Sequence, residues 1–332
     1  MNAGAPVYSL SPGFNKGEIL IAGGGGVSKS GLPNSLIFAK INDDGSFQTI
    51  ATRKFEKQVT CVTARLAKKK TYAAVAVGSE IILMNRRYEP ITTFDTHMQK
   101  FIFRSLDIAP TGHIMVAVDG DDSLRLFSLP SLKEIASTHE NSVQRASFMT
   151  IDGNLYIACA SQNKIQILKP ESDLPLVAES EEFQLEPKEV KCVDNVIYFN
   201  GADKKKMCSS IIKLAFNGSP NLAELSNVTP GAKMFTAMGV TSNSVLLATR
   251  DGDVVILNRF SLKISKIIPK VHTFIGSAIT GVDNFVVSGS FDHSVVATEY
   301  HEVKQNFKKF IYLCVAVLLL AVFIGISVNH GK

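Results

Sequence analysis

The 332-residue sequence has no tryptophan, and its five cysteines form no C-x-x-C pair and have no neighbouring pair of histidines. An odd number of widely spaced cysteines supports neither a disulfide framework nor a zinc site, so the thiols are expected to be buried and reduced. The N-terminal stretch MNAGAPVYSLSPGF also lacks a basic region followed by an apolar run. It therefore does not predict a secretory signal.

A pronounced excess of one charge is absent too. The chain has 35 Lys and Arg against 30 Asp and Glu, a net charge of +5. Two lysine runs, 68–70 and 204–206, lie between apolar segments and are interpreted as solvated turns. Without a basic stripe, no nucleic-acid partner is expected. No Ser/His/Asp or Cys/His arrangement stands out, so we predict neither covalent catalysis nor a small-molecule substrate.

The longest apolar run lies near the C-terminus. Residues 310–328, FIYLCVAVLLLAVFIGISV, contain no charge over 19 positions, which is enough to cross the hydrocarbon core of a bilayer. We predict a single transmembrane helix there, because a buried globular helix would normally keep a polar face. A span of this length suits the thinner bilayer of the endoplasmic reticulum (ER).

The residues that flank this run predict its orientation. Three lysines make the segment 304–309 a basic juxtamembrane linker, whereas only one lysine follows the span, in the tail 329–332. Basic flanks remain in the cytosol. Residues 1–303 are therefore predicted to form a cytosolic domain of a single-pass membrane protein, and residues 329–332 a lumenal tail.

A period near 44 residues organises the rest of the chain. Segments that resemble a third strand begin at Asn34, Gly78, Asp122, Asn163, Cys208, Gly252 and His293, at intervals of 44, 44, 41, 45, 44 and 41 residues. Strand-rich repeats of about 40–45 residues are typical of WD40 propellers. The sequence thus predicts an all-β fold, one seven-bladed WD40-like β-propeller, even though the WD dipeptide is missing with the tryptophan.

The repeat also predicts turns, and it leaves the closure of the ring open. Asp119-Gly120, Asp251-Gly252 and Asp292-His293 are expected between second and third strands, where Asp-Gly suits a hairpin. The last unit shows no obvious fourth strand. The N-terminal APVYSLS either supplies that strand or is the inner strand of the first blade.

Residues 22–34, AGGGGVSKSGLPN, form a turn more than twice as long as its counterparts. Residues 23–30 match the phosphate-binding pattern G-x-x-x-x-G-K-[ST], except that Ser28 replaces the second glycine. The NSLIFAKI that follows is typical of a strand, so the helix N-terminus that binds phosphate in such motifs is missing. We therefore predict a hairpin loop in blade one, and extra length in a single blade's loop usually carries function.

The loop pattern IAGGGGxxKxGxxN in blade one, seven degenerate blades and a C-terminal anchor together resemble one family. It is the prolactin regulatory element-binding protein family, ER-resident guanine-nucleotide exchange factors that activate the Sar-type small GTPase of the COPII coat. The resemblance covers the architecture of the whole chain, but the match between residues is concentrated in 20–37. It implies that this chain promotes GDP release at the ER membrane and so initiates COPII coat assembly.

The resemblance also implies a metal ion. In that family the glycine-rich loop folds around potassium, so Gly23, Gly24, Gly25 and Gly26 are expected to offer backbone carbonyls to K⁺. The chemistry is reasonable, because closely spaced carbonyl oxygens can replace the hydration shell of K⁺. Glycine lets several such carbonyls converge without side chains colliding.

The other end of the loop is implied to contact the GTPase. By position, Leu32, Pro33 and Asn34 would form the tip that meets the switch regions of the partner. The amide of Asn34 can either pin the loop or reach the partner, and the plain alternative is an asparagine that merely begins a strand. Lys29 lies where relatives vary and receives no role.

Two other functions remain open at this point. A membrane-tethered propeller that acts only as a scaffold, with the loop holding a protein or a lipid headgroup, would have the same fold. A DNA-binding regulator fits less well, because the charge is dispersed and a membrane span is predicted.

Overall fold

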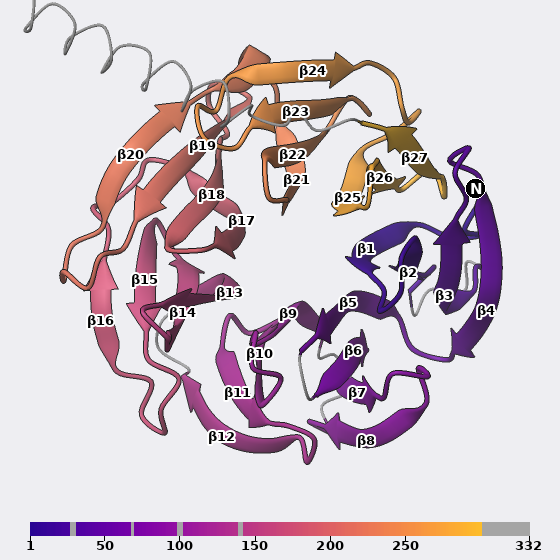
Figure 1. The fold of residues 1–332 in the computed structure, drawn as a ribbon, viewed down its shortest axis with the longest axis horizontal. Helices are drawn as coiled ribbons and strands as arrows, with labels where there is room; N and C mark the ends of the chain where they lie inside the picture. Colours follow the sequence, from indigo (N-terminus) through magenta and orange to yellow (C-terminus); the bar gives the residue numbers. More distant parts are fainter. Residues whose placement is uncertain (27–30, 68–69, 98–101, 139–141, 301–332) are drawn as a thin grey trace, which may run out of the picture. The chain divides into compact units, whose positions relative to one another are not determined.

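The computed structural model describes residues 1–26, 31–67, 70–97, 102–138 and 142–300. In this part of the chain, 27 strands form seven antiparallel sheets, which are arranged as blades around a central axis (Figure 1). The predicted all-β, seven-bladed propeller is therefore confirmed. Its compact unit is Met1–Tyr300.

Each blade is a meander whose first strand is innermost (Figure 1). Blade one comprises β1 (Val7–Pro12), β2 (Glu18–Gly23), β3 (Asn34–Ile41) and β4 (Phe47–Phe55). Blade two comprises β5 (Val59–Leu66), β6 (Thr71–Val77), β7 (Glu80–Met84) and β8 (Pro90–Asp95). Blade three comprises β9 (Phe103–Ile108), β10 (Ile114–Asp119), β11 (Leu124–Ser128) and β12 (Lys133–Thr138).

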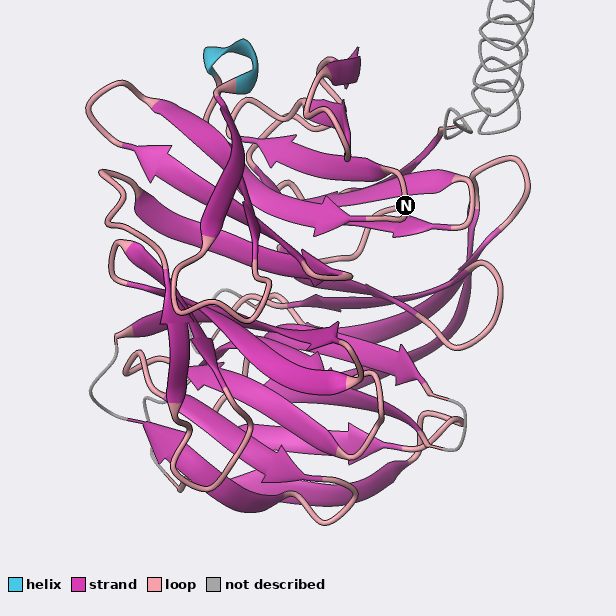
Figure 2. Cartoon of the chain, turned by 60° about the vertical axis from the view of Figure 1, so that its left-hand side comes forward, coloured by secondary structure: helices cyan, strands magenta, loops and turns pink. Residues whose placement is uncertain are grey.

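The remaining blades repeat this order. Blade four comprises β13 (Val143–Ile151), β14 (Asn154–Ser161), β15 (Lys164–Leu168) and β16 (Leu176–Glu179). Blade five comprises β17 (Glu186–Val193), β18 (Val196–Asp203), β19 (Cys208–Ala215) and β20 (Ala223–Val228). Blade six comprises β21 (Phe235–Val240), β22 (Ser244–Thr249), β23 (Val254–Asn258) and β24 (Ile264–Ile268). Blade seven has three strands, β25 (Gly276–Val282), β26 (Phe285–Ser290) and β27 (Val295–Glu299). The one helical turn among the described residues is η1 (Pro230–Ala232), which is drawn in cyan in Figure 2.

The hydrophobic core lies between the blades. Seven clusters of buried side chains each join two neighbouring sheets. In β6, Ala73 and Val75 pack towards blade one, whereas Ala74 and Ala76 pack towards blade three. Successive side chains of a strand point to opposite faces of the sheet. A middle strand whose blade is packed between two other blades must therefore be apolar on both faces. The middle strands therefore read as continuous apolar runs.

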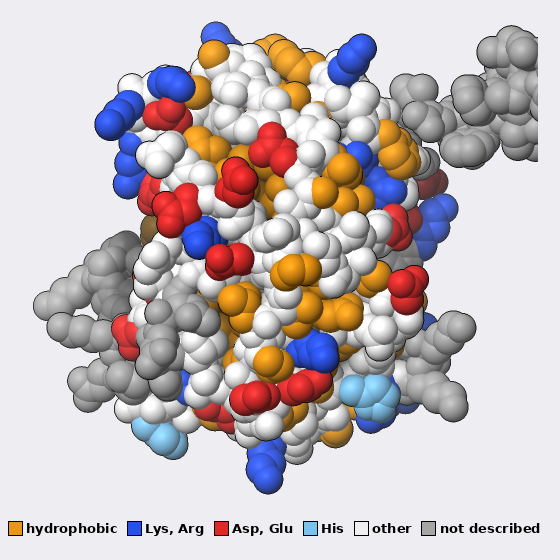
Figure 3. Space-filling view, turned by 90° about the vertical axis from the view of Figure 1, so that its left-hand side faces the viewer, with side chains coloured by type: hydrophobic (Ala, Val, Ile, Leu, Met, Phe, Trp, Pro, Cys, Tyr) orange, Lys and Arg blue, Asp and Glu red, His pale blue; other side chains and the backbone are white. Residues whose placement is uncertain are grey.

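The outermost strands differ, because one of their faces meets water. Residues of β4 are mostly exposed, and several outer strands each present isolated large apolar side chains. On the side formed by β12, β16 and β20, apolar side chains are interrupted by acidic and basic ones (Figure 3). Isolated exposed apolar residues are ordinary on a protein surface.

The predicted third strands and turns are confirmed. Every segment singled out by the repeat begins at, or within two residues of, the third strand of its blade. The three expected Asp-containing turns lie between second and third strands, as in Asp119-Gly120 between β10 and β11. We call the end of the propeller that carries these turns the loop face. The connections between successive blades lie on the same face, since the chain passes through two strands, the third and the fourth, between such a turn and the next blade.

The N-terminal APVYSLS takes the second of the two roles left open by the sequence, and the residues before it close the ring. β1 is the inner strand of blade one. Upstream of it, Asn2 pairs with Ser294, Ala3 N–H donates to the His293 carbonyl at 2.8 Å, and Val295 N–H donates to the Met1 carbonyl at 2.8 Å. Residues 1–3 thus form a short fourth edge on blade seven, next to β27.

Four of the cysteines are described. Cys61, Cys159 and Cys208 are buried and Cys192 is half-buried. Burial disfavours the charged thiolate and raises the pKa of Cys61 to about 12. Cys61 is therefore a poor nucleophile, and burial of three of the four described thiols agrees with the prediction that the thiols are buried.

The predicted linker 304–309, transmembrane helix 310–328 and tail 329–332 lie outside the described residues. Within the described ranges, no helix has the length and apolar character needed to span a bilayer.

Candidate functional site

The β2–β3 connection of blade one is the longest turn between second and third strands. It runs over residues 24–33, ten positions, whereas the corresponding turns of the other blades have two or four residues, for example 78–79 and 120–123. Residues 27–30, which include Lys29, lie outside the described residues. The loop joins the paired strands β2 and β3 at the loop face, so its two ends are neighbours in blade one.

Asn34 fixes the base of this loop. It is the first residue of β3 and is only 6% exposed. Its Oδ1 accepts a hydrogen bond from Gly26 N–H at 3.1 Å, and its Nδ2 donates to the Gly26 carbonyl at 3.3 Å. Nδ2 also donates to the Glu56 carbonyl at 3.1 Å, beyond the end of β4. One amide therefore joins both arms of the loop to the rest of the blade.

This geometry decides between the two roles considered for the asparagine amide. The side chain of Asn34 points to the loop's own backbone, where it pins Gly26, so Asn34 is a positioning residue at the base. Pro33 is exposed and Leu32 is half-buried, so these two remain the predicted tip. Pro33 lies beside the N-terminal segment, since a Cβ on Gly4 would be 3.9 Å from its Cγ.

The first two glycines are required by close approach. A Cβ on Gly23 would be 2.4 Å from the Pro6 carbonyl oxygen, and a Cβ on Gly24 would be 2.2 Å from Asn34 Oδ1. Real Cβ atoms do not approach other atoms so closely, because van der Waals repulsion forbids it. Gly24 N–H in turn donates to the Pro6 carbonyl at 3.0 Å. A side chain at Gly24 would therefore displace the amide that pins the loop.

The described part of the loop could offer a cation only neutral oxygen atoms, those of its backbone carbonyls and of the Asn34 amide. Gly23 belongs to β2 and pairs with Val7 and Ser35 in the sheet, so the loop proper begins at Gly24. Of these oxygens, the Asn34 Oδ1 accepts from Gly26 N–H, and the Gly26 carbonyl accepts from Asn34 Nδ2. Neutral carbonyl oxygens match K⁺. In the described residues no group of His, Cys, Asp or Glu side chains is arranged to hold a metal.

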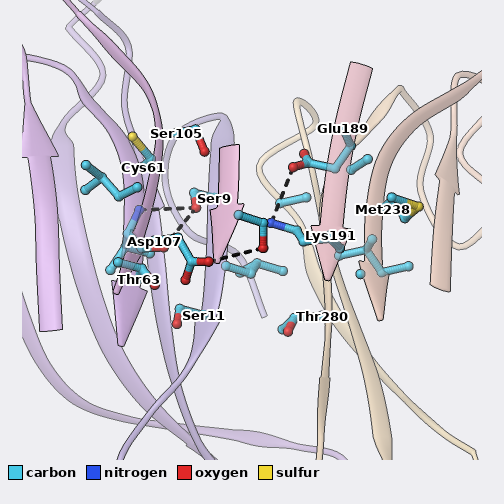
Figure 4. A pocket seen from close by; sticks show the side chains of 18 of the residues that line it. Ser9, Ser11, Cys61, Thr63, Ser105, Asp107, Glu189, Lys191, Met238 and Thr280 are labelled. Atoms are coloured by element: carbon cyan, nitrogen blue, oxygen red, sulfur yellow. Dashed lines mark hydrogen bonds and ion pairs between the residues drawn. The ribbon is translucent and has the colours of Figure 1, made fainter. Parts of the chain in front are cut away.

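A second polar site lines the axis of the propeller and was not predicted. The inner strands enclose a cavity of about 510 Å³ (Figure 4). Glu189 accepts from Lys191 at 3.3 Å and pairs with Arg145 at 3.8 Å, while Asp107 pairs with Arg65 at 3.5 Å. The charges of Glu189 and Asp107 raise the pKa of Lys191 and keep it protonated.

These channel charges belong to blades two to five, and blades one, six and seven contribute hydroxyl and small apolar groups instead. Each carboxylate has a cationic partner from the channel wall, and Asp107 also accepts from Ser147 Oγ at 3.1 Å. The network therefore ties inner strands of neighbouring blades together. No sequence motif signals it, because its members come from four inner strands that are far apart in the chain, β5, β9, β13 and β17.

The structure also reveals a Ser/His/Asp arrangement that the sequence did not suggest. His272 contacts Ser288 Oγ at 2.8 Å and Ser294 Oγ at 2.6 Å, and its Nδ1 is 3.8 Å from Asp292. Ser288 is 1% exposed, so no substrate can reach it. Burial lowers the pKa of His272, which favours the neutral ring. His272, which lies between β24 and β25, thus joins Ser288 of β26 to Ser294 of the β26–β27 turn. These contacts stabilise blade seven.

No protein-family model matches this chain, and a search of curated proteins found no relative. The site must therefore be interpreted from its own geometry and from the sequence pattern of the loop.

Proposed function

We propose that this chain is a guanine-nucleotide exchange factor for a Sar-type small GTPase, acts from the ER membrane, and thereby initiates COPII coat assembly. The observation that carries the proposal is the ten-residue β2–β3 loop, whose base Asn34 holds in one geometry. The sequence pattern of that loop supplies the identity of the partner. The propeller would act as a rigid support and the loop as the element that meets the GTPase.

The proposed reaction needs no bond making or breaking by the propeller. A factor that binds the nucleotide-free GTPase more tightly than the GDP-bound form weakens GDP binding by the same ratio. A loop already fixed at its base loses little conformational entropy when it binds. The hydrogen bonds of Asn34 therefore favour tight binding to the emptied GTPase.

Potassium enters the proposal through the same loop. Gly24 to Gly26 would hold the ion with backbone carbonyl oxygens, and K⁺ would supply a positive centre toward which these carbonyls turn. Asn34 would then support the loop from its base while the ion supports it from within.

GDP release from a purified Sar-type GTPase tests the proposal. With the full-length chain in proteoliposomes and excess GTP, we expect substoichiometric protein to accelerate the release of a fluorescent GDP analogue at least tenfold. A Ras-type GTPase serves as the control substrate and should not respond. Tight binding of the Sar-type GTPase without faster release would instead support the scaffold function.

The proposed cytosolic orientation makes a separate prediction about glycosylation. Asn217 and Asn227 each begin a glycosylation sequon, Asn217-Gly218-Ser219 and Asn227-Val228-Thr229, and both side chains are exposed. Because glycosylation occurs in the ER lumen, neither site should be modified in the native protein. We expect endoglycosidase treatment of protein from eukaryotic cells to leave its gel mobility unchanged.

A version carrying an added N-terminal signal peptide is the control for this experiment, since it delivers the same exposed sequons to the lumen. That version should shift in mobility on digestion. A shift of the native protein would place the propeller in the lumen, away from any cytosolic GTPase.

A further inference from the structure

Two phenylalanines of blade seven are exposed on the loop face. Phe274, between β24 and β25, is 65% exposed, and Phe291, in the β26–β27 turn, is 42% exposed. Their segments are tied together: Phe291 N–H donates to the Ile275 carbonyl at 3.3 Å, and Thr273 donates through N–H and Oγ1 to Asp292 at 2.7 and 3.0 Å. The two rings are therefore presented by turns of fixed conformation.

A chain of contacts connects these rings to the glycine-rich loop. The Phe291 ring packs edge-on against Tyr8 of β1, with ring centroids 5.8 Å apart. Just before Tyr8 in the chain, the Pro6 carbonyl accepts from Gly24 N–H, and Gly4 lies beside Pro33. We call Phe274, Phe291, Tyr8 and Pro33 the seam surface, because they cross the junction of blades seven and one.

The seam surface, in which Tyr8 is half-buried at the edge of the axial cavity and the other three residues are exposed, differs from the exposed apolar residues elsewhere. Ile50 and Ile135, for example, are single residues on the outer strands β4 and β12. The seam surface instead brings three aromatic side chains and a proline together where blade seven meets blade one. Exposed aromatic clusters on rigid supports are typical of the energetic centre of protein interfaces.

We propose that the seam surface is the docking site for an apolar patch on the same GTPase that the loop contacts, an inference that rests on the proposed function. Four side chains cover only part of the roughly 800 Å² that each partner buries in a standard interface. They must therefore act together with a neighbouring contact region, and the β2–β3 loop adjoins them directly. In this arrangement the aromatic residues of the seam surface supply affinity, and the loop, to which Pro33 belongs, acts on the nucleotide site.

This division of labour has a kinetic signature. A contact made equally with the GDP-bound and nucleotide-free GTPase lowers KM without changing kcat. The double variant Phe274→Ser/Phe291→Ser of the full-length chain in proteoliposomes should therefore raise the KM for the GTPase at least tenfold and leave kcat within twofold. Phe274→Ser alone, at the more exposed position, should raise KM by a smaller factor.

Phe260→Ser is the matched control. Phe260 is 45% exposed, but it lies in the β23–β24 turn, at the end of the propeller opposite the loop face. It should change neither constant. An unchanged KM in the double variant, with a wild-type melting temperature, would overturn the docking site. If the double variant has a lowered melting temperature, Phe274→Ser alone becomes the test. An unchanged KM in that single variant would also overturn the docking site.

The proposed function can fail separately from this inference. If the wild-type protein binds nucleotide-free GTPase in calorimetry but does not accelerate GDP release, the exchange proposal is wrong. A tenfold weaker affinity of the double variant in that titration would still support the docking site, and an unchanged affinity would refute it. If the wild-type protein shows neither binding nor release, both proposals are wrong.

Discussion

Replacing Asn34 with alanine should lower the rate of GDP release at least tenfold while the propeller stays folded. The substitution removes two hydrogen bonds to Gly26 and one to the Glu56 carbonyl. Each hydrogen bond contributes about 1 kcal/mol, and about 1.4 kcal/mol is a tenfold change in the population of the fixed loop. The measurement is GDP release from the Sar-type GTPase with the full-length variant in proteoliposomes.

The melting temperature should fall by only a few degrees in this variant. The freed backbone groups of Gly26 lie in a surface loop where water can reach them, and Asn34 belongs to none of the seven interblade clusters. Three hydrogen bonds of about 1 kcal/mol each set an upper limit of about 3 kcal/mol on the loss, and each 1 kcal/mol shifts the melting temperature of a large domain by roughly 2–4 °C. Circular dichroism and a thermal melt check this expectation.

Asn163→Ala is the control for Asn34→Ala. Asn163 precedes β15, the equivalent place in blade four, and its Nδ2 donates only to Glu182 at 3.3 Å. It should leave GDP release unchanged. Gly24→Ala should reproduce the loss, because the new Cβ would collide with Asn34 Oδ1. Wild-type release by Asn34→Ala would remove the loop from the mechanism and leave the scaffold function as the better proposal.

Replacing KCl by equimolar LiCl or tetramethylammonium chloride should lower GDP release by the wild-type protein about tenfold. The swap keeps ionic strength, and therefore charge screening, nearly constant, so a purely electrostatic association would not respond. An ion that binds only the active loop stabilises it by about 1.4 kcal/mol at a tenfold excess over its Kd, which is the origin of the expected factor.

The effects of the ion and of Asn34 should overlap. If both support one loop geometry, the loss in Asn34→Ala on changing the salt should be clearly smaller than the loss in the wild-type protein. Asn163→Ala should respond to the salt as the wild type does. Equal release by the wild-type protein in all three salts would exclude a potassium-dependent loop.

The propeller itself could be predicted because each of its blades places the same physical requirements on the sequence. Each middle strand must be apolar on both faces, as in β6, and each blade except the first turns tightly before its third strand, as at Asp251-Gly252. These demands recur every 41 to 45 residues and are visible without an alignment. The fourth edge of blade seven was less visible, because residues 1–3 pair with a strand almost the whole chain away.

The candidate site was only partly predictable. The length and glycine content of the loop marked the place, but the sequence left two orientations for the amide of Asn34, and only its contacts with Gly26 and Glu56 distinguish them. The axial network that joins Asp107 to Arg65 and Glu189 to Arg145 had no signal at all, since contacts between separate strands depend on how the blades are placed. The seam surface was not predicted either, because its residues come together only when blades seven and one are in place.

A chain that is still being synthesised cannot present the surface at which blade seven meets blade one. The glycine-rich loop emerges with the first blade, whereas Phe291 belongs to the last. At 5–20 residues per second, about 13 to 50 s separate the synthesis of Pro33 from that of Phe291. The proposed activity would therefore arise in one step with the final blade. Nascent chains with a finished loop would not compete for the GTPase, and a bound GTPase would in turn hold the ring closed.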